Sequence, residues 1–190
     1  MNQIEPIVRE PATYRDVLEA PANMVAELVA GRLHLQPRPA SRHGFAASGL
    51  GVKIGGPFGF DDGDGPGGWW IIGEPELHFG EDVLVPDVAG WRRECLPSYP
   101  DVAYFELAPD WVCEVLSPST RQFDLVEKRA VYARERVAHL WLVDPLAKSL
   151  EAFTLRDGAW VLVAALRDDQ PVQLAPFDAI LFELSALWPD

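Results

Sequence analysis

This 190-residue sequence has little cysteine and no long apolar run. Its two cysteines, Cys95 and Cys113, are too few for a disulfide framework, and Cys113 lies in an apolar, strand-like run, so we expect a reducing, cytoplasmic compartment. No secretory segment opens the chain and no apolar stretch of about eighteen residues occurs. Neither export nor membrane spanning is indicated, and we expect no membrane partner.

Positive charge is also scarce. The 16 lysines and arginines face 29 aspartates and glutamates, which gives a net charge of −13. A surface of this sign repels DNA at long range, whereas phosphate binding normally draws on lysine and arginine patches. Basic residues do cluster between residues 121 and 136, so a local basic patch is compatible with the sequence. A bound metal ion would offset part of the negative charge.

The composition is that of a globular protein, with 48% apolar and 11% aromatic residues. At this length we expect one domain, spanning residues 1–190, with a sizeable core. The fold class that the pattern favours is α/β with mixed, α+β character.

The clearest fold signal is a strand, a helix and a second strand between residues 111 and 143. Trp111–Leu116 reads as a buried strand, and Ser117-Pro118-Ser119-Thr120 is a break followed by a helix start. A helix is expected over residues 121–137, with an apolar stripe at Phe123, Val126, Ala130, Ala133 and Val137. With a strand at 139–143, this predicts a βαβ unit with a right-handed crossover.

Hairpins and further helices surround this unit. Ala30-Gly31 predicts a hairpin over residues 24–35, with Glu27 on its first strand, and Asp157-Gly158 predicts another between 150–155 and 160–166. Ser41 is a candidate cap for a helix over residues 42–54, although its glycines disfavour one. The apolar tail, 177–188, is expected to end in a short helix.

A glycine-rich loop over residues 58–68 carries two misleading motifs. Residues 63–68 fit GxGxxG, but a strand-like run follows them, whereas a dinucleotide fingerprint requires a helix there. Asp62 and Asp64 begin like a calcium loop, but Pro66 occupies a ligand position and no glutamate closes the site. We interpret both motifs as ordinary loop sequence.

Two carboxylates lie within apolar, strand-like runs. Asp87 falls in the run 83–91, on one face with four apolar residues, and Glu114 falls in the strand 111–116. A carboxylate at such a place costs several kcal/mol unless a positive group compensates it. Two converging carboxylates repel each other, and a bound cation or a buried basic side chain would relieve this.

Each candidate residue also has a structural explanation. Asp87 could be a turn residue after Pro86, and Glu114 could form a structural salt bridge. Lys128 could pair with Asp124 on an exposed helix face, four residues apart. Glu27 could be a surface hairpin residue and His43 a surface or cap residue; these alternatives stay open at this point.

Taken together, the residues favour a site for one or two divalent cations acting on a phosphodiester. Asp87 and Glu114 are the expected ligands of Mg²⁺ or Mn²⁺, since these ions prefer hard oxygen donors. Lys128 is expected to orient the nucleophile or stabilise charge in the transition state. His43 and Asp124 are candidates for supporting positions around these ligands.

The same residues carry a family resemblance. Pro86-Asp87, the run from Glu114 to Thr120, the set Asp124, Lys128 and Tyr132, and the strand end Trp141–Pro145 resemble the Uma-two family of putative restriction endonucleases. That family is a branch of the PD-(D/E)XK nuclease superfamily. The segment 27–33 and the spacing from Pro39 to His43 are similar to its N-terminal pattern, so the resemblance runs from about Tyr14 to the C-terminus.

The resemblance implies a restriction-endonuclease-like core, in which helices flank a mixed sheet and the aspartate and glutamate hold metal. The superfamily's usual lysine stands two residues after the glutamate, where this chain has Leu116. The family places a lysine on the following helix instead, here Lys128. A role for Glu27, as a catalytic or supporting acid, comes from the resemblance.

The first functional prediction is therefore a Mg²⁺- or Mn²⁺-dependent DNA endonuclease. One alternative is a non-catalytic binding or assembly module of the same fold, which the net charge favours. A second alternative is a metal-dependent hydrolase of small phosphorylated substrates. Self-association is also expected, with a homodimer as the preferred form and the Trp69-Trp70 pair and the apolar tail as candidate contacts.

Overall fold

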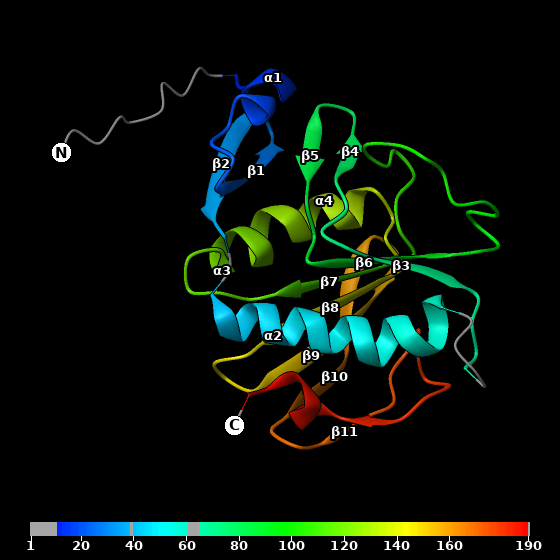
Figure 1. The fold of residues 1–190 in the computed structure, drawn as a ribbon. Helices are drawn as coiled ribbons and strands as arrows, with labels where there is room; N and C mark the ends of the chain where they lie inside the picture. The colour runs from blue at the N-terminus through cyan, green and yellow to red at the C-terminus, as the bar shows by residue number, and fades with distance from the viewer. Residues whose placement is uncertain (1–10, 39, 61–64, 190) are drawn as a thin grey trace.

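The central element is a six-stranded mixed sheet with the order β10-β9-β8-β7-β6-β3 (Figure 1). The computed structural model describes residues 11–38, 40–60 and 65–189. β7 and β8 are parallel and the other neighbours are antiparallel. The strands are β3 (Trp69–Gly73), β6 (Val88–Arg92), β7 (Trp111–Val115), β8 (His139–Asp144), β9 (Ser149–Arg156) and β10 (Ala159–Arg167).

Helices cover both faces of this sheet (Figure 1). On one face, α2 (Ser41–Leu50) continues into the π-helical η1 (Gly51–Gly59). On the other, α3 (Arg121–Phe123), the π-helical η2 (Asp124–Lys128) and α4 (Arg129–Arg134) follow one another. This confirms the predicted mixed sheet flanked by helices, and the β7–helix–β8 unit confirms the βαβ prediction.

Side-chain alternation along β7 determines which of its residues face the helices on each side of the sheet. Trp111, Cys113 and Val115 pack in the core that includes α2 and η1, whereas Val112 packs in the core that includes α4. Because successive side chains of a strand point to opposite faces, Glu114 points with Val112 toward the η2–α4 side.

A second, antiparallel sheet has the order β2-β1-β5-β4. Ala30 (φ 51°) and Gly31 (φ 72°) form the turn of the β1–β2 hairpin, in the left-handed conformations that a tight hairpin turn requires. Both predicted hairpins are confirmed, since β9 and β10 pair around Asp157-Gly158. The strands of this sheet are β1 (Met24–Val29), β2 (Arg32–Pro37), β4 (Leu77–Phe79) and β5 (Asp82–Leu84).

The remaining elements are short. α1 (Tyr14–Leu18) precedes the first hairpin, and β11 (Pro171–Val172) pairs with β12 (Phe182–Glu183). The 3₁₀ helix η3 (Leu184–Leu187) confirms the predicted helical end of the tail. No helix in the described parts of the chain is long and apolar enough to cross a membrane. Both cysteines are free thiols.

The expectation of one strand over residues 83–91 was wrong. The run divides into β5, which belongs to the smaller sheet, and β6, which belongs to the larger one. Pro86 lies in the break, where it has no N–H to contribute to a ladder. Asp87 therefore lies at the passage between two sheets, as its turn interpretation proposed, and not in mid-strand.

Two details of the predicted helices were also wrong. Ala40 is the N-cap of α2, and Ser41 is its first helical residue. In the helix after β7, Val126 and Ala130 are exposed, while Asp124 and Lys128 are buried. The buried face of this helix therefore carries two charged residues in place of part of the expected apolar stripe, which hydrophobic patterning cannot anticipate.

The candidate self-association contacts are largely internal. Trp69 is buried in the core on the α2 side, and so are Phe177, Leu184 and Trp188 of the tail. The predicted dimer stays a prediction, but these side chains are not available to form it. Residues 62–64 of the two loop motifs lie outside the described residues, and β3 begins at Trp69, directly after the GxGxxG-like run.

Close packing at Gly90 gives a first testable prediction. A Cβ atom built there would stand 2.8 Å from Ile71 Cδ1 and 3.2 Å from a ring carbon of Trp69. We expect Gly90→Ala to lower the free energy of unfolding by about 1–3 kcal/mol, because the core must shift to admit the methyl group. Gly51→Ala is the matched control: its Cβ meets nothing within 4 Å, and its φ of −54° suits alanine. Denaturant unfolding of the two variants checks this, and equal stabilities would contradict it.

Candidate active site

The candidate site gathers side chains from five elements. Glu27 comes from β1, Asp87 from the β5–β6 passage, and Glu114 from β7. Asp124 and Lys128 come from η2, and His43 comes from α2. All six residues line one cavity of about 330 Å³, which we call the carboxylate cavity. The structure thus brings together every residue that the sequence analysis selected.

Lys128 is the centre of the site. Its ammonium lies 2.8 Å from Glu114 Oε1 and 3.0 Å from Glu27 Oε1, and it donates to the Val85 carbonyl at 3.1 Å. Asp124 Oδ1 lies farther away, at 3.8 Å. Lys128 and Asp124 are only 2% and 4% exposed, so this is not the exposed helix pair of the alternative interpretation.

Glu114 and Glu27 are each held by additional donors. The Tyr132 hydroxyl donates to Glu114 Oε1 at 2.5 Å. Glu27 accepts the Val85 N–H on Oε1 and the Gln36 side-chain amide on Oε2, both at 2.8 Å. Glu27 is therefore a buried, oriented carboxylate rather than a surface hairpin residue.

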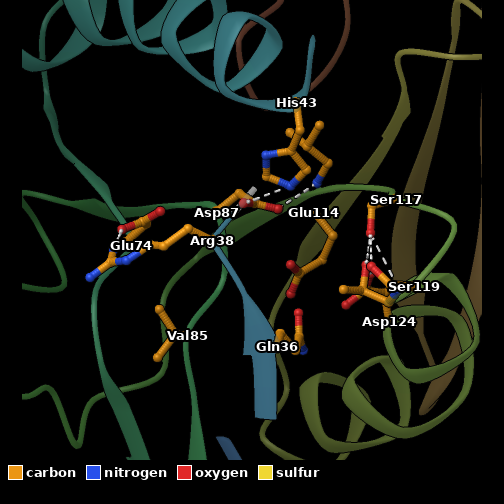
Figure 2. Close-up of polar contacts among 12 residues, drawn as sticks. Gln36, Arg38, His43, Glu74, Val85, Asp87, Glu114, Ser117, Ser119 and Asp124 are labelled. Carbon is orange, nitrogen blue, oxygen red and sulfur yellow. Dashed lines mark hydrogen bonds and ion pairs between the residues drawn. The ribbon is translucent and has the colours of Figure 1, made fainter. Parts of the chain in front are cut away.

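Asp87 is held from two sides. Its Oδ2 accepts the Val115 N–H at 2.7 Å, which ties the passage between the sheets to the end of β7. His43 Nε2 lies 3.1 Å from Asp87 Oδ1. Figure 2 shows His43 against Asp87, and the carboxylates of Asp87 and Glu114 facing the same open space.

Hydroxyl groups complete one wall of the cavity. Thr120 Oγ1 donates to Asp124 Oδ2 at 2.6 Å, and the Ser117 hydroxyl lies 3.0 Å from the hydroxyls of both Ser119 and Thr120. Figure 2 shows Ser117 and Ser119 beside Asp124. On the opposite rim, Arg38 lies 3.7 Å from Glu74. Arg38 is 61% exposed in its side chain, so it presents positive charge at the mouth of the cavity.

Acidic side chains outnumber basic ones among the described residues that line the carboxylate cavity. Burial raises the pKa of Glu27, and it raises the pKa of Glu114 well above its usual range. Burial alone would lower the pKa of Lys128, but attraction to Glu114 and Glu27 outweighs it and raises that pKa well above its ordinary value. Lys128 is therefore charged, yet one lysine cannot balance all the carboxylates that line the cavity.

A divalent cation suits this donor set. No group of three or more His, Cys, Asp or Glu side chains within the described residues is arranged to hold a metal alone. Mg²⁺, however, is commonly bound by one or two carboxylates and completes its shell with water and substrate phosphate oxygens. Asp87 and Glu114 would supply those carboxylates. Glu114 Oε1 is engaged by Lys128 and Tyr132, and no described residue donates to its Oε2.

Several residues of the site were not predicted to belong to it. Tyr132 appeared only in the family resemblance, and Gln36 and Thr120 were not singled out. Gln36 could have been found from the hairpin register, because Glu27 pairs with His34 and Gln36 is then its diagonal neighbour on the same face. The backbone of Val85 contacts Glu27 and Lys128, and the Val115 N–H contacts Asp87. These contacts depend on how the chain passes between the two sheets, which no residue type in the sequence indicates.

The fold is restriction-endonuclease-like, as a comparison with solved structures shows. One similar solved structure is described as a "putative nuclease belonging to DUF820" from Anabaena variabilis ATCC 29413. It has a TM-score of 0.67 and 20% sequence identity, over 93% of this chain and 97% of that chain. At this identity the likeness shows the fold.

The family follows from a second comparison. The model of the Uma2 family, described as "Putative restriction endonuclease", matches residues 11–185. The chain therefore belongs to the Uma2 family, as the resemblance in its sequence indicated. No curated protein matches the sequence.

Proposed function

We propose that this protein is a Mg²⁺- or Mn²⁺-dependent endonuclease that hydrolyses phosphodiester bonds in DNA. The observation that carries the proposal is the buried contact between Lys128 and two glutamates, in a cavity that Asp87 also lines. The family and the fold, both those of nuclease-like proteins, support the same reaction class.

The carboxylates, the lysine and the residues around them have separate roles in this reaction. Asp87 and Glu114 would hold the cation, which when bound lowers the pKa of water and withdraws charge from the phosphate. Lys128 holds positive charge beside the reacting phosphate and stabilises the charge that develops in the transition state. Glu27, Gln36 and the Val85 backbone fix the lysine and its partners in place.

Arg38 and the hydroxyls of Ser117 and Ser119 are candidates for contacting the substrate phosphate. They line the same cavity and offer donors to phosphate oxygens without adding negative charge. The protein carries a net charge of −13, so this local set would have to supply the attraction that the overall surface does not.

A cleavage assay tests the proposal. Wild-type protein is expected to cut DNA in Mg²⁺ or Mn²⁺ and to stop when the metal is chelated, while Glu114→Gln stays inactive in both conditions because the amide cannot replace the carboxylate charge. A panel of plasmid, linear duplex and single-stranded DNA, together with small phosphate esters, covers the substrate classes. Metal-independent cleavage, or cleavage of the small esters alone, would overturn the proposal.

A further inference from the structure

A second cavity, of about 940 Å³, opens directly beside the carboxylate cavity. We call it the glycine groove. One wall is the face of α2 and η1 that carries Gly44, Gly51 and Gly56, and Ile71 and Val88 also line it. Its volume falls in the range of ligand sites. His43, Glu74 and Asp87 line both cavities, so the groove is continuous with the candidate active site.

The glycines of this wall have no explanation within the fold. A Cβ atom at Gly44, Gly51 or Gly56 would meet nothing within 4 Å, whereas one at Gly49 would lie 3.0 Å from Leu187. Packing therefore requires the glycine at 49 and not the other three. Glycine destabilises a helix interior relative to alanine, and one use that offsets this is the close approach of a ligand to the backbone.

The charge of the groove determines which part of a nucleic acid fits it. Among the described residues, its lining includes Glu74 and Asp87 but no lysine or arginine. Phosphates would find no counter-charge in this groove, whereas an uncharged base and sugar need none. Phe60, 66% exposed, lines the groove and offers a ring for base stacking.

We propose that the glycine groove binds the base and sugar of an unpaired nucleotide next to the phosphodiester at Asp87. The inference rests on the proposed function, and it narrows the substrate to single-stranded nucleic acid or an unpaired end. A base within a duplex is stacked and paired, so it cannot enter a pocket without being extruded. A single strand also carries less charge per length than a duplex, which suits an acidic protein.

Binding in metal-free buffer tests the inference without requiring cleavage. Fluorescence anisotropy of a short labelled oligothymidylate, of an oligouridylate of equal length and of a matched duplex gives three affinities for each variant. Phe60→Ala removes the groove's exposed ring, and Phe45→Ala is its matched control, since Phe45 is 46% exposed and lines neither cavity. Gly51→Leu fills the groove, while Gly51→Ala leaves it largely open and reports on helix stability.

We expect wild type to bind a single strand more tightly than the duplex, and Phe60→Ala and Gly51→Leu to lose about tenfold or more in that affinity. Phe45→Ala is expected to bind as wild type, and Gly51→Ala to melt at or above the wild-type temperature. The two labelled single strands show whether the nucleotide comes from DNA or RNA. Unchanged single-strand binding in a folded Gly51→Leu variant, or a preference for duplex, would overturn the inference.

The outcomes separate the two proposals. If single-strand binding is lost in Gly51→Leu but no nucleic acid is cut under any metal condition, the groove assignment holds and the nuclease proposal fails. If wild type cuts duplex DNA and Gly51→Leu cuts it equally well, the nuclease proposal holds and the groove assignment fails.

Discussion

Replacing Asp87 by asparagine is expected to lower the rate of phosphodiester cleavage by about 10²–10³-fold while the protein stays folded. The asparagine carbonyl can still accept the Val115 N–H, which now donates to Asp87 Oδ2 at 2.7 Å. It cannot supply the negative charge that would hold a divalent cation beside Glu114. Rates with labelled DNA in Mn²⁺, and thermal melting of both proteins, provide the measurement.

Asp82→Asn is the matched control. Like Asp87, Asp82 accepts a backbone N–H, from Ala30 at 2.8 Å, and pairs with a basic side chain, Arg134, at 2.8 Å. It lines neither the carboxylate cavity nor the glycine groove. Asp82→Asn is therefore expected to cut DNA at the wild-type rate below its melting temperature. Equal loss in both variants would mean that Asp87 acts through folding.

Replacing Lys128 by methionine is expected to lower the free energy of unfolding by about 3–5 kcal/mol at neutral pH. The substitution leaves Glu27 and Glu114, which are 1% and 2% exposed, without their shared counter-ion. Methionine roughly preserves the volume of the side chain, so the loss reports on charge rather than on a cavity. Chemical denaturation across a pH series is the measurement.

The pH dependence of this variant has a definite sign. Burial already raises the pKa of Glu27 and Glu114 in the folded protein, and Lys128 opposes that rise. Without the lysine both values rise further, so the folded state binds protons that the unfolded state has released. Stability of Lys128→Met should then fall as the pH rises above the unfolded pKa of glutamate, and it should recover in acid.

A double variant separates charge from packing. Adding Glu27→Gln to Lys128→Met removes one uncompensated carboxylate, so the double variant should be more stable than the sum of the two single effects. If Lys128→Met lowers the free energy of unfolding by less than about 1 kcal/mol, and this loss does not change with pH, the expectation is contradicted. A loss of that size is typical of an exposed ion pair.

The site residues that the sequence predicted most directly are the carboxylates that interrupt apolar, strand-like runs. Glu114 stood out because β7 is apolar on both faces, and the alternation along that strand directs it toward the η2–α4 layer. Asp87 was found as an anomaly in an apolar run, although its setting was misjudged. Strand pairing in the smaller sheet ends before Pro86, and pairing in the larger sheet begins after it. Alternation of apolar residues continues through this point, so it cannot reveal that the chain changes sheets.

The remaining errors also have physical causes. Lys128 and Asp124 fit an exposed helical pair, because charged residues four apart on a helix usually face solvent, whereas here both are buried and the lysine pairs with the glutamates of two strands. The glycines of α2 and η1 lowered the expectation of a helix, yet a helix formed, and three of them face the open groove. In both cases a local rule fails beside the site, where such departures are expected.

The most direct test of the central claim is calorimetric titration of Mn²⁺ into the wild-type protein and into Asp87→Asn. We expect about one or two equivalents of Mn²⁺ to bind the wild-type protein, and this binding to be lost in the folded variant. Absence of binding to folded wild-type protein would contradict the account. The buried lysine and its carboxylates would then serve structure, and the nuclease-like fold would act as a binding module.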